Sequence, residues 1–213
     1  MVTISKKISY KTVSDGAQTV HIDKKSKFIA NVKPVETEED ALEFLAQIKK
    51  QYSDASHNVY AYIIDENNIT RYSDDGEPGG TAGMPVLDTI RKEGLVDVIV
   101  VVTRYFGGTL LGTGGLVRAY TASAKSGLTE AGIVTMTLCN TVEIKADYTL
   151  VGRIQYKISS ENYILEDTAY GDYVTFKICC RIGDTERFLE DMVDLTDGRI
   201  EYSVSEEPKY IKF

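Results

Sequence analysis

Three carboxylates lie within four consecutive residues, Asp74, Asp75 and Glu77, in a glycine-rich segment that runs from Ser73 to Gly83. Carboxylate oxygens at this density could hold a divalent cation such as magnesium, or one of them could act as a general acid or base. The alternative is an acidic turn in which an aspartate caps its own backbone. Because no further ligands of regular spacing complete the set, we expect no metal here and favour the turn.

A second glycine-rich segment runs from Arg104 through Gly107 and Gly108 to Gly112-Thr-Gly-Gly115, and a predicted helix follows it. Exposed amides at a helix start suit an anion, while close packing of the helix on a sheet is the alternative use of these glycines. The spacing fits neither a phosphate-binding P-loop nor a dinucleotide fingerprint. We therefore expect no nucleotide cofactor, and no other cofactor is indicated.

Residues 1–138 contain only four arginines, and Arg71, Arg104 and Arg118 lie beside the glycine segments. Arginine recognises phosphate or carboxylate with two hydrogen bonds, so these guanidinium groups could bind a ligand or equally the nearby carboxylates. Arg104 is followed by two aromatic residues, a combination that suits stacking on bases but is also common in packing. The predicted anion- or nucleic-acid-binding residues are Arg71, Arg104, Tyr105, Gly107, Gly108, Gly112, Thr113, Gly114, Gly115, Arg118 and Lys27, the last from a small basic run, Lys24, Lys25 and Lys27.

The two histidines, His21 and His57, complete the set of groups that could do chemistry. No serine or cysteine nucleophile in an identifiable motif accompanies His57, so a catalytic triad is not supported. We expect no catalytic residue. The alternative is an enzyme in which Asp74, Asp75 or Glu77 holds a metal or acts as a base and His57 assists.

Composition places the chain among soluble globular proteins of the cytoplasm. Of its 213 residues, 43% are hydrophobic and 26% charged, and the net charge is -8. The segment 139–213 carries 9 basic and 15 acidic residues, which leaves 15 basic and 17 acidic in 1–138. Such an acidic chain is a poor non-specific binder of nucleic acid, so no DNA specificity is inferred, although a local basic face is allowed. No segment resembles a membrane span or a secretory signal, and three cysteines form no disulfide framework.

The pattern of apolar residues predicts an α+β protein with two domains, 1–138 and 139–213. Strands are expected within 8–35 around a turn near 15–16, and at 58–65, 69–72, 96–103 and 133–138, with helices from Thr37 to about 50 and at 84–93 and 116–129. The segment 96–103 is nearly all β-branched and apolar, so we expect a buried central strand. From 139 onward we expect strands at 141–146, 163–170, 173–182 and 200–204 and helices at 150–159 and 184–195. This is the βαββαβ order of a ferredoxin-like sandwich.

Four segments also resemble the YigZ/IMPACT family over nearly the whole chain. They are Ser26-Lys-Phe-Ile-Ala, Ala55-Ser-His-Asn-Val-Tyr-Ala-Tyr, Asp74-Asp-Gly-Glu-Pro-Gly-Gly-Thr-Ala-Gly-Met-Pro and Val102-Thr-Arg-Tyr-Phe-Gly-Gly-Thr-Leu-Leu-Gly-Thr-Gly-Gly-Leu-Val-Arg-Ala-Tyr120. The resemblance implies an IMPACT-type first domain with a mixed sheet, as in ribosomal-protein and GHMP-kinase folds. It implies a second domain similar to the ferredoxin-like C-terminal module of elongation factor G.

The resemblance also implies a link to translation, because eukaryotic relatives regulate it through a stress-kinase pathway with the help of an additional protein-binding domain. Our leading hypothesis is therefore a non-enzymatic protein that contacts RNA, the ribosome or a translation factor through its arginine and glycine loops. The rival is a small-molecule enzyme, a metal-assisted hydrolase or phosphoryl-transfer catalyst. No membrane partner is expected, and the sequence does not indicate an oligomeric state.

Overall fold

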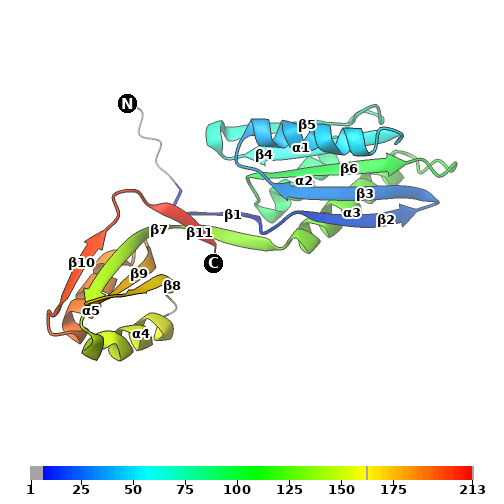
Figure 1. Ribbon diagram of the computed structural model, residues 1–213. Coiled ribbons are helices and arrows are strands. Elements are labelled where there is room, and N and C mark those ends of the chain that lie inside the picture. The colour runs from blue at the N-terminus through cyan, green and yellow to red at the C-terminus, as the bar shows by residue number, and fades with distance from the viewer. Residues whose placement is uncertain (1–6, 162, 213) are drawn as a thin grey trace. The chain divides into compact units, whose positions relative to one another are not determined.

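The computed structural model describes residues 7–161 and 163–212, which divide into two compact units (Figure 1). One unit spans residues 10–135. The other combines residues 7–9 with residues 136–212. None of the helices in the described part of the chain has the length and hydropathy needed to cross a bilayer.

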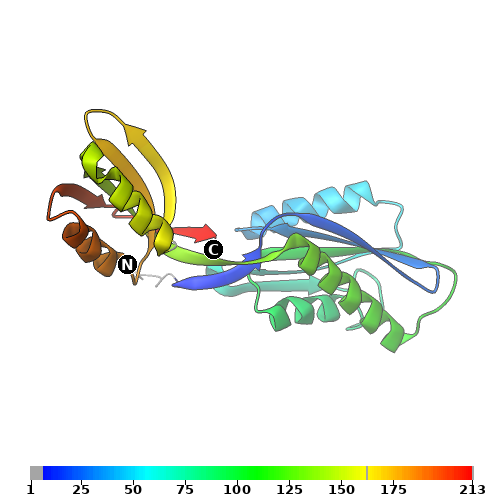
Figure 2. The same cartoon turned by 90° about the horizontal axis from the view of Figure 1, so that it is seen from below.

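A five-stranded antiparallel sheet forms the centre of the unit 10–135, in the order β2-β3-β6-β4-β5. Its strands are β2 (Ala17–Asp23), β3 (Ser26–Pro34), β4 (His57–Ile64), β5 (Ile69–Ser73) and β6 (Val98–Tyr105), and a short 3-10 turn, η1 (Glu66–Asn68), joins β4 to β5. Helix α1 (Glu38–Gln51) covers one face, and α2 (Gly83–Glu93) and α3 (Thr113–Ala131) cover the other (Figures 1 and 2).

The central strand β6 is buried on both faces, as its apolar sequence predicts. Val98, Val100 and Val102 belong to the core under α2 and α3, whereas Ile99 and Val101 pack with α1. This alternation follows from the two-residue repeat of a strand. The strand begins at Val98 rather than at the predicted Val96.

Local signals set the helix starts. Thr37 and Asp40 form a reciprocal capping box at the start of α1, and three acidic residues occupy its first turn, an arrangement that satisfies free amides and suits the helix dipole. Helix α3 begins at Thr113, three residues before the predicted start, because Gly112 takes a left-handed φ of 72° as its N-cap. The second glycine segment therefore ends inside the helix.

The second unit has the predicted βαββαβ order. It consists of β7 (Ile133–Ala146), η2 (Tyr148–Leu150) with α4 (Val151–Ser160), β8 (Ile164–Tyr170), β9 (Val174–Arg181), α5 (Thr185–Leu195) and β10 (Ile200–Val204), and its strands lie in the order β10-β7-β9-β8. A single core, which includes Ile154 of α4, Phe188 of α5 and Phe176 of β9, shows that both helices pack on one face of the sheet.

Three features of this sheet differ from the prediction. Residues 133–138 and 141–146 are one strand, β7, because Cys139 and Asn140 continue the pairing with β9. The chain divides at 135/136, within that strand, whereas the predicted boundary lay at 138/139. One short strand was not predicted, β11 (Lys209–Lys212), which pairs with residues 136–139 of β7. The strand β1 (Ser9–Val13), which precedes the predicted turn near 15–16, also pairs with β7.

Candidate functional site

The two glycine-rich segments converge on the carboxylate of Glu77. Its Oε1 accepts a hydrogen bond from the Arg104 guanidinium at 2.6 Å and another from the Tyr120 hydroxyl at 2.8 Å. All three side chains are buried, and they come from the first loop, from β6 and from α3. Of the two uses open to Arg104, the structure shows the internal one, so a phosphate contact by this residue would have to replace its ion pair with Glu77.

The carboxylate of Asp74 organises the backbone of the first loop. It accepts hydrogen bonds from the N–H groups of Gly80, Ala82 and Gly83 at 2.9, 3.0 and 2.8 Å. Gly83 also lies directly on Ser73, because a Cβ atom at position 83 would be 2.7 Å from the carbonyl carbon of Ser73. Asp74 thus caps amides of its own loop, which is the kind of contact expected of an acidic turn.

Asp75 connects the same loop to β4 and α1. Its carboxylate accepts the N–H of Asn58 at 2.7 Å and pairs with the Lys49 ammonium at 3.0 Å. Burial alone would raise the pKa of this carboxyl, but the two donors outweigh burial and hold the pKa below its ordinary value. The group is therefore anionic at neutral pH, as these contacts require.

His57 is held in one orientation beside the buried carboxylate. Its Nδ1 lies 2.8 Å from the carbonyl oxygen of Asp75, and its Nε2 lies 3.9 Å from Oε2 of Glu77. Because a carbonyl oxygen only accepts, Nδ1 carries a proton and Nε2 is the basic nitrogen of the neutral ring. A base with a fixed tautomer is the one feature of this cluster that resembles catalytic machinery.

The carboxylates of the first loop all make hydrogen bonds or ion pairs within the protein. Each binds amide, ammonium, guanidinium or hydroxyl donors of the chain itself, and across residues 7–161 and 163–212 no group of three or more histidine, cysteine or acidic side chains is placed to hold a metal ion. The arrangement is that of an anchor which joins the first loop to β6 and α3.

The loop that follows β6 packs against the turn between β2 and β3, at one end of the sheet (Figure 1). A Cβ atom on Gly107 would overlap the backbone of Lys25 and Ser26, and the Gly107 N–H donates to the Ser26 hydroxyl at 3.2 Å. Lys24 and Lys25 both have positive φ angles, 43° and 70°, and both are exposed. Glycine at 107 is therefore required for the contact between this loop and the lysine turn, and the preceding residue, Phe106, is 49% exposed.

The start of α3 is open to solvent at the same loop. Gly112, Thr113 and Gly114 are exposed, as is Arg118, and within the described residues no side chain caps the first amides of the helix. Gly108, with φ of 81°, lies in the loop between Phe106 and this helix start. Gly115 has a different use: it is buried, and a Cβ atom there would be 2.9 Å from the Cβ of Leu111.

Three predicted binding residues lie elsewhere on the sheet. Lys27 and Tyr105 face each other across β3 and β6, one position from the Phe28–Arg104 pair, so they point to the face that carries α1. Tyr105 donates to Asp54 at 2.7 Å. Arg71 lies on the edge strand β5, 3.5 Å from Glu38 of α1. The structure does not bring these residues together with Arg118.

The residues that sequence reasoning missed are Tyr120 and Ser26. Tyr120 lies on the buried face of α3 with its ring edge against Phe28, and Ser26 accepts the Gly107 N–H and lies 3.4 Å from the Arg104 guanidinium. Both belong to the family-like segments, but neither a tyrosine in an apolar helix face nor a lone serine has a spacing signal that would have singled it out.

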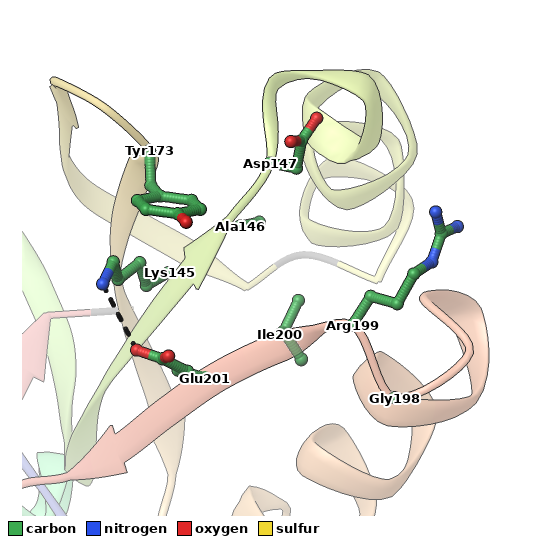
Figure 3. A pocket seen from close by; sticks show the side chains of 8 residues that line it. All are labelled: Lys145, Ala146, Asp147, Tyr173, Gly198, Arg199, Ile200 and Glu201. Carbon is green, nitrogen blue, oxygen red and sulfur yellow. Dashed lines mark hydrogen bonds and ion pairs between the residues drawn. The ribbon is translucent and has the colours of Figure 1, made fainter.

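The second unit contains a shallow pocket where β7 ends and β10 begins (Figure 3). Lys145 lies over the Tyr173 ring, 4.5 Å from its centroid, and its ammonium is 3.3 Å from Glu201. Arg199 lies 3.6 Å from Asp197. The cations at this pocket are thus matched by neighbouring carboxylates, so the pocket offers no excess positive charge.

The fold and the site define a two-domain α+β protein in which two glycine-rich loops close over a buried glutamate–arginine–tyrosine cluster. Residues 24–128 match the Impact N-terminal domain, and residues 144–199 match a domain of unknown function, DUF1949. The chain is 42% identical over 192 residues to the IMPACT family member YvyE of Bacillus subtilis (strain 168), with 90% of this chain and 88% of the relative covered. The chain therefore belongs to the IMPACT family, which confirms the resemblance read from the sequence.

Other relatives extend this picture. IMPACT family member YigZ of Escherichia coli (strain K12) is 28% identical, with 86% of this chain and 92% of the relative covered. Protein IMPACT homolog of Dictyostelium discoideum is 42% identical, but the match covers only 42% of this chain and 27% of that protein. A crystal structure described as that of a hypothetical protein superposes with a TM-score of 0.60 at 27% identity, covering 95% of this chain and 100% of that one.

Proposed function

We propose that this chain is a translation-linked binding protein that contacts RNA, free or within the ribosome, through one end of its first sheet. This surface, the basic end, consists of Lys24 and Lys25 in the β2–β3 turn, Phe106, the open amides at 112–114 and Arg118. The observation that carries the proposal is the backbone contact between Gly107 and Lys25, because it brings the lysine turn and the aromatic loop into one surface.

Charge and exposure support phosphate as the ligand of the basic end. Its cations, Lys24, Lys25 and Arg118, are exposed. Uncapped amides at a helix start add partial positive charge. Phosphate contacts of this kind dominate nucleic-acid affinity and weaken as salt rises.

The buried cluster has a supporting part in this proposal. Glu77 fixes Arg104 at the end of β6 and Tyr120 in α3, so the loop between these two elements begins and ends on rigid positions. Holding a binding loop in one conformation lowers the entropy cost of binding. The link to translation is drawn from membership of the IMPACT family, and location in the cytoplasm is part of the same proposal.

Fluorescence anisotropy with a labelled RNA oligonucleotide at about 50 mM salt tests RNA binding, and co-sedimentation tests binding to ribosomes. Replacing Lys24 and Lys25 by alanine should weaken binding about tenfold or more and reduce its salt dependence. Lys125→Ala, which removes an exposed cation from α3, should leave affinity unchanged. If the wild type binds neither RNA nor ribosomes at low salt, or binds only a purified translation factor, RNA contact by the basic end is wrong.

The orientation of His57 supports a second candidate function, that of a small-molecule enzyme. In this reading Nε2 of His57 is the base, and Asp74, Asp75 or Glu77 would hold a metal or assist. Screening metabolites for turnover with and without magnesium addresses it. The loss of any such turnover in Asp75→Asn would support the enzyme, and an unchanged rate would count against it.

A further inference from the structure

We infer that Phe106 is a stacking platform for an unpaired base, so that the RNA taken by the basic end is single-stranded. This inference rests on the proposed function and makes it more specific. Phe106 is 49% exposed although it directly follows a buried strand. Single-strand binding proteins combine cationic side chains with exposed aromatic rings on which bases stack.

The ring of Phe106 is supported from within the protein by Arg104. The guanidinium carbon lies over the Phe106 ring, 5.6 Å from its centroid, and 5.4 Å from the centroid of the buried Phe28. Nε of Arg104 finds no hydrogen-bond partner among the described residues. The guanidinium is thus placed by Glu77 and lies against aromatic rings, an arrangement that stabilises both through a cation–π contact.

The backbone on either side of the ring is also fixed. The Phe106 N–H donates to the Ser56 hydroxyl at 3.2 Å, and the next N–H, that of Gly107, donates to Ser26 at the same distance. Because the backbone that carries the ring is already fixed, little conformational entropy is lost when a base stacks on it. The buried ion pair and the two serine contacts therefore have one consequence, a rigid and partly open aromatic surface.

The shape of the basic end favours a single strand over a duplex. In an RNA duplex the flat faces of the bases are stacked on each other, so an exposed ring reaches only bases that are unpaired and splayed out. The backbone of the β2–β3 turn packs against Gly107, the residue after Phe106, so we expect the exposed lysines of that turn to contact the phosphates of the stacked nucleotide. Stacking is tolerant of sequence, so we expect little base preference.

The chain contains no tryptophan, which makes Phe106→Trp a direct reporter. Its fluorescence should be quenched when a short oligouridine binds, and an abasic oligonucleotide of the same length should cause little quenching. Phe106→Leu, which keeps an apolar side chain but removes the ring, should weaken binding of oligouridine about 5- to 100-fold. The same variant should bind the abasic strand as the wild type does. Leu110→Ala serves as the control, since it shortens another exposed apolar side chain in the same loop, at 83% exposure.

The outcomes separate this inference from the proposed function. If the Lys24 and Lys25 variant loses affinity while Phe106→Leu does not, and duplex and single strand bind equally, RNA binding stands and base stacking is wrong. If no nucleic acid binds at low salt, both are wrong. If the fluorescence of Phe106→Trp changes only when a protein partner is added, the surface is a protein interface, and RNA binding at this surface is wrong.

Discussion

Glu77 is the residue on which the arrangement of both loops depends. It is a buried carboxylate with a guanidinium and a phenol on one oxygen, and burial raises the pKa of the Tyr120 hydroxyl above its usual range. We predict that Glu77→Gln destabilises the protein by about 3 kcal/mol, because Arg104 then lacks its buried counter-charge. Urea unfolding measures this loss. Glu43→Gln, on the exposed surface of α1, should change stability by less than about 0.5 kcal/mol, and equal effects of the two variants would contradict the role of Glu77.

The Asp75 carboxyl predicts a pH dependence of stability. Its pKa in the folded protein is held below the ordinary value of 3.8, so its contribution is complete above that value and is lost as pH falls through the lower folded pKa. Asp75→Asn should be less stable than the wild type at pH 7, and the difference should shrink on acidification to about pH 3. Asparagine also tolerates the positive φ of 43° at this position, so backbone strain does not obscure the comparison. A gap of constant size in unfolding curves at pH 7, 5 and 3 would show that the carboxylate charge is not the cause.

At the scale of elements, the glycine after Phe106 decides whether the β2–β3 turn and the β6–α3 loop meet. Any side chain at 107 overlaps the Lys25 backbone, whereas a Cβ at Gly79 in the first loop has no atom within 4 Å. We predict that Gly107→Ala lowers the free energy of unfolding by about 3 kcal/mol. Gly79→Ala should leave the free energy of unfolding unchanged or raise it slightly. Thermal unfolding compares the two. RNA affinity should fall with the first only, and a Gly107→Ala protein of normal stability and affinity would refute the contact.

Elements with strong local signals could be predicted from sequence, whereas the site could be predicted only as one of two uses of its arginines, pairing with the carboxylates of the first loop. The N-cap threonine at 37 with the acidic residues after it predicted α1, the β-branched run predicted β6, and alternation with turns predicted the βαββαβ unit. The short strand β11 was missed because four residues carry little periodicity. Glu77 meets Arg104 and Tyr120 across separations of 27 and 43 residues, and local patterns do not determine contacts of that range. For the same reason Arg71 and Lys27 were grouped with residues from which the sheet separates them.

At the scale of the whole molecule, the two units have separate cores and different charge. Residues 139–213 carry a net charge of 9 - 15 = -6, against 15 - 17 = -2 for residues 1–138. The carboxylates near the pocket of the second unit are matched with lysine and arginine. The second unit therefore offers little attraction for a polyanion, which places the expected RNA contact on the first unit and leaves the second available for a different partner.

Separate cores also predict separate unfolding. Phe176 is fully buried in the core of the second unit, and Ile90 is fully buried in the core of the first. Truncating either residue to alanine should lower the free energy of unfolding by about 3 to 5 kcal/mol, and each truncation should destabilise the unit that contains it. Hydrogen exchange in increasing urea, followed by mass spectrometry, should show residues 136–212 opening earlier in Phe176→Ala and residues 10–135 opening earlier in Ile90→Ala. The strands β1 and β7 each contribute residues to both units, so either loss could spread through them. Simultaneous opening of both units in each variant would show that the chain unfolds as a single cooperative structure.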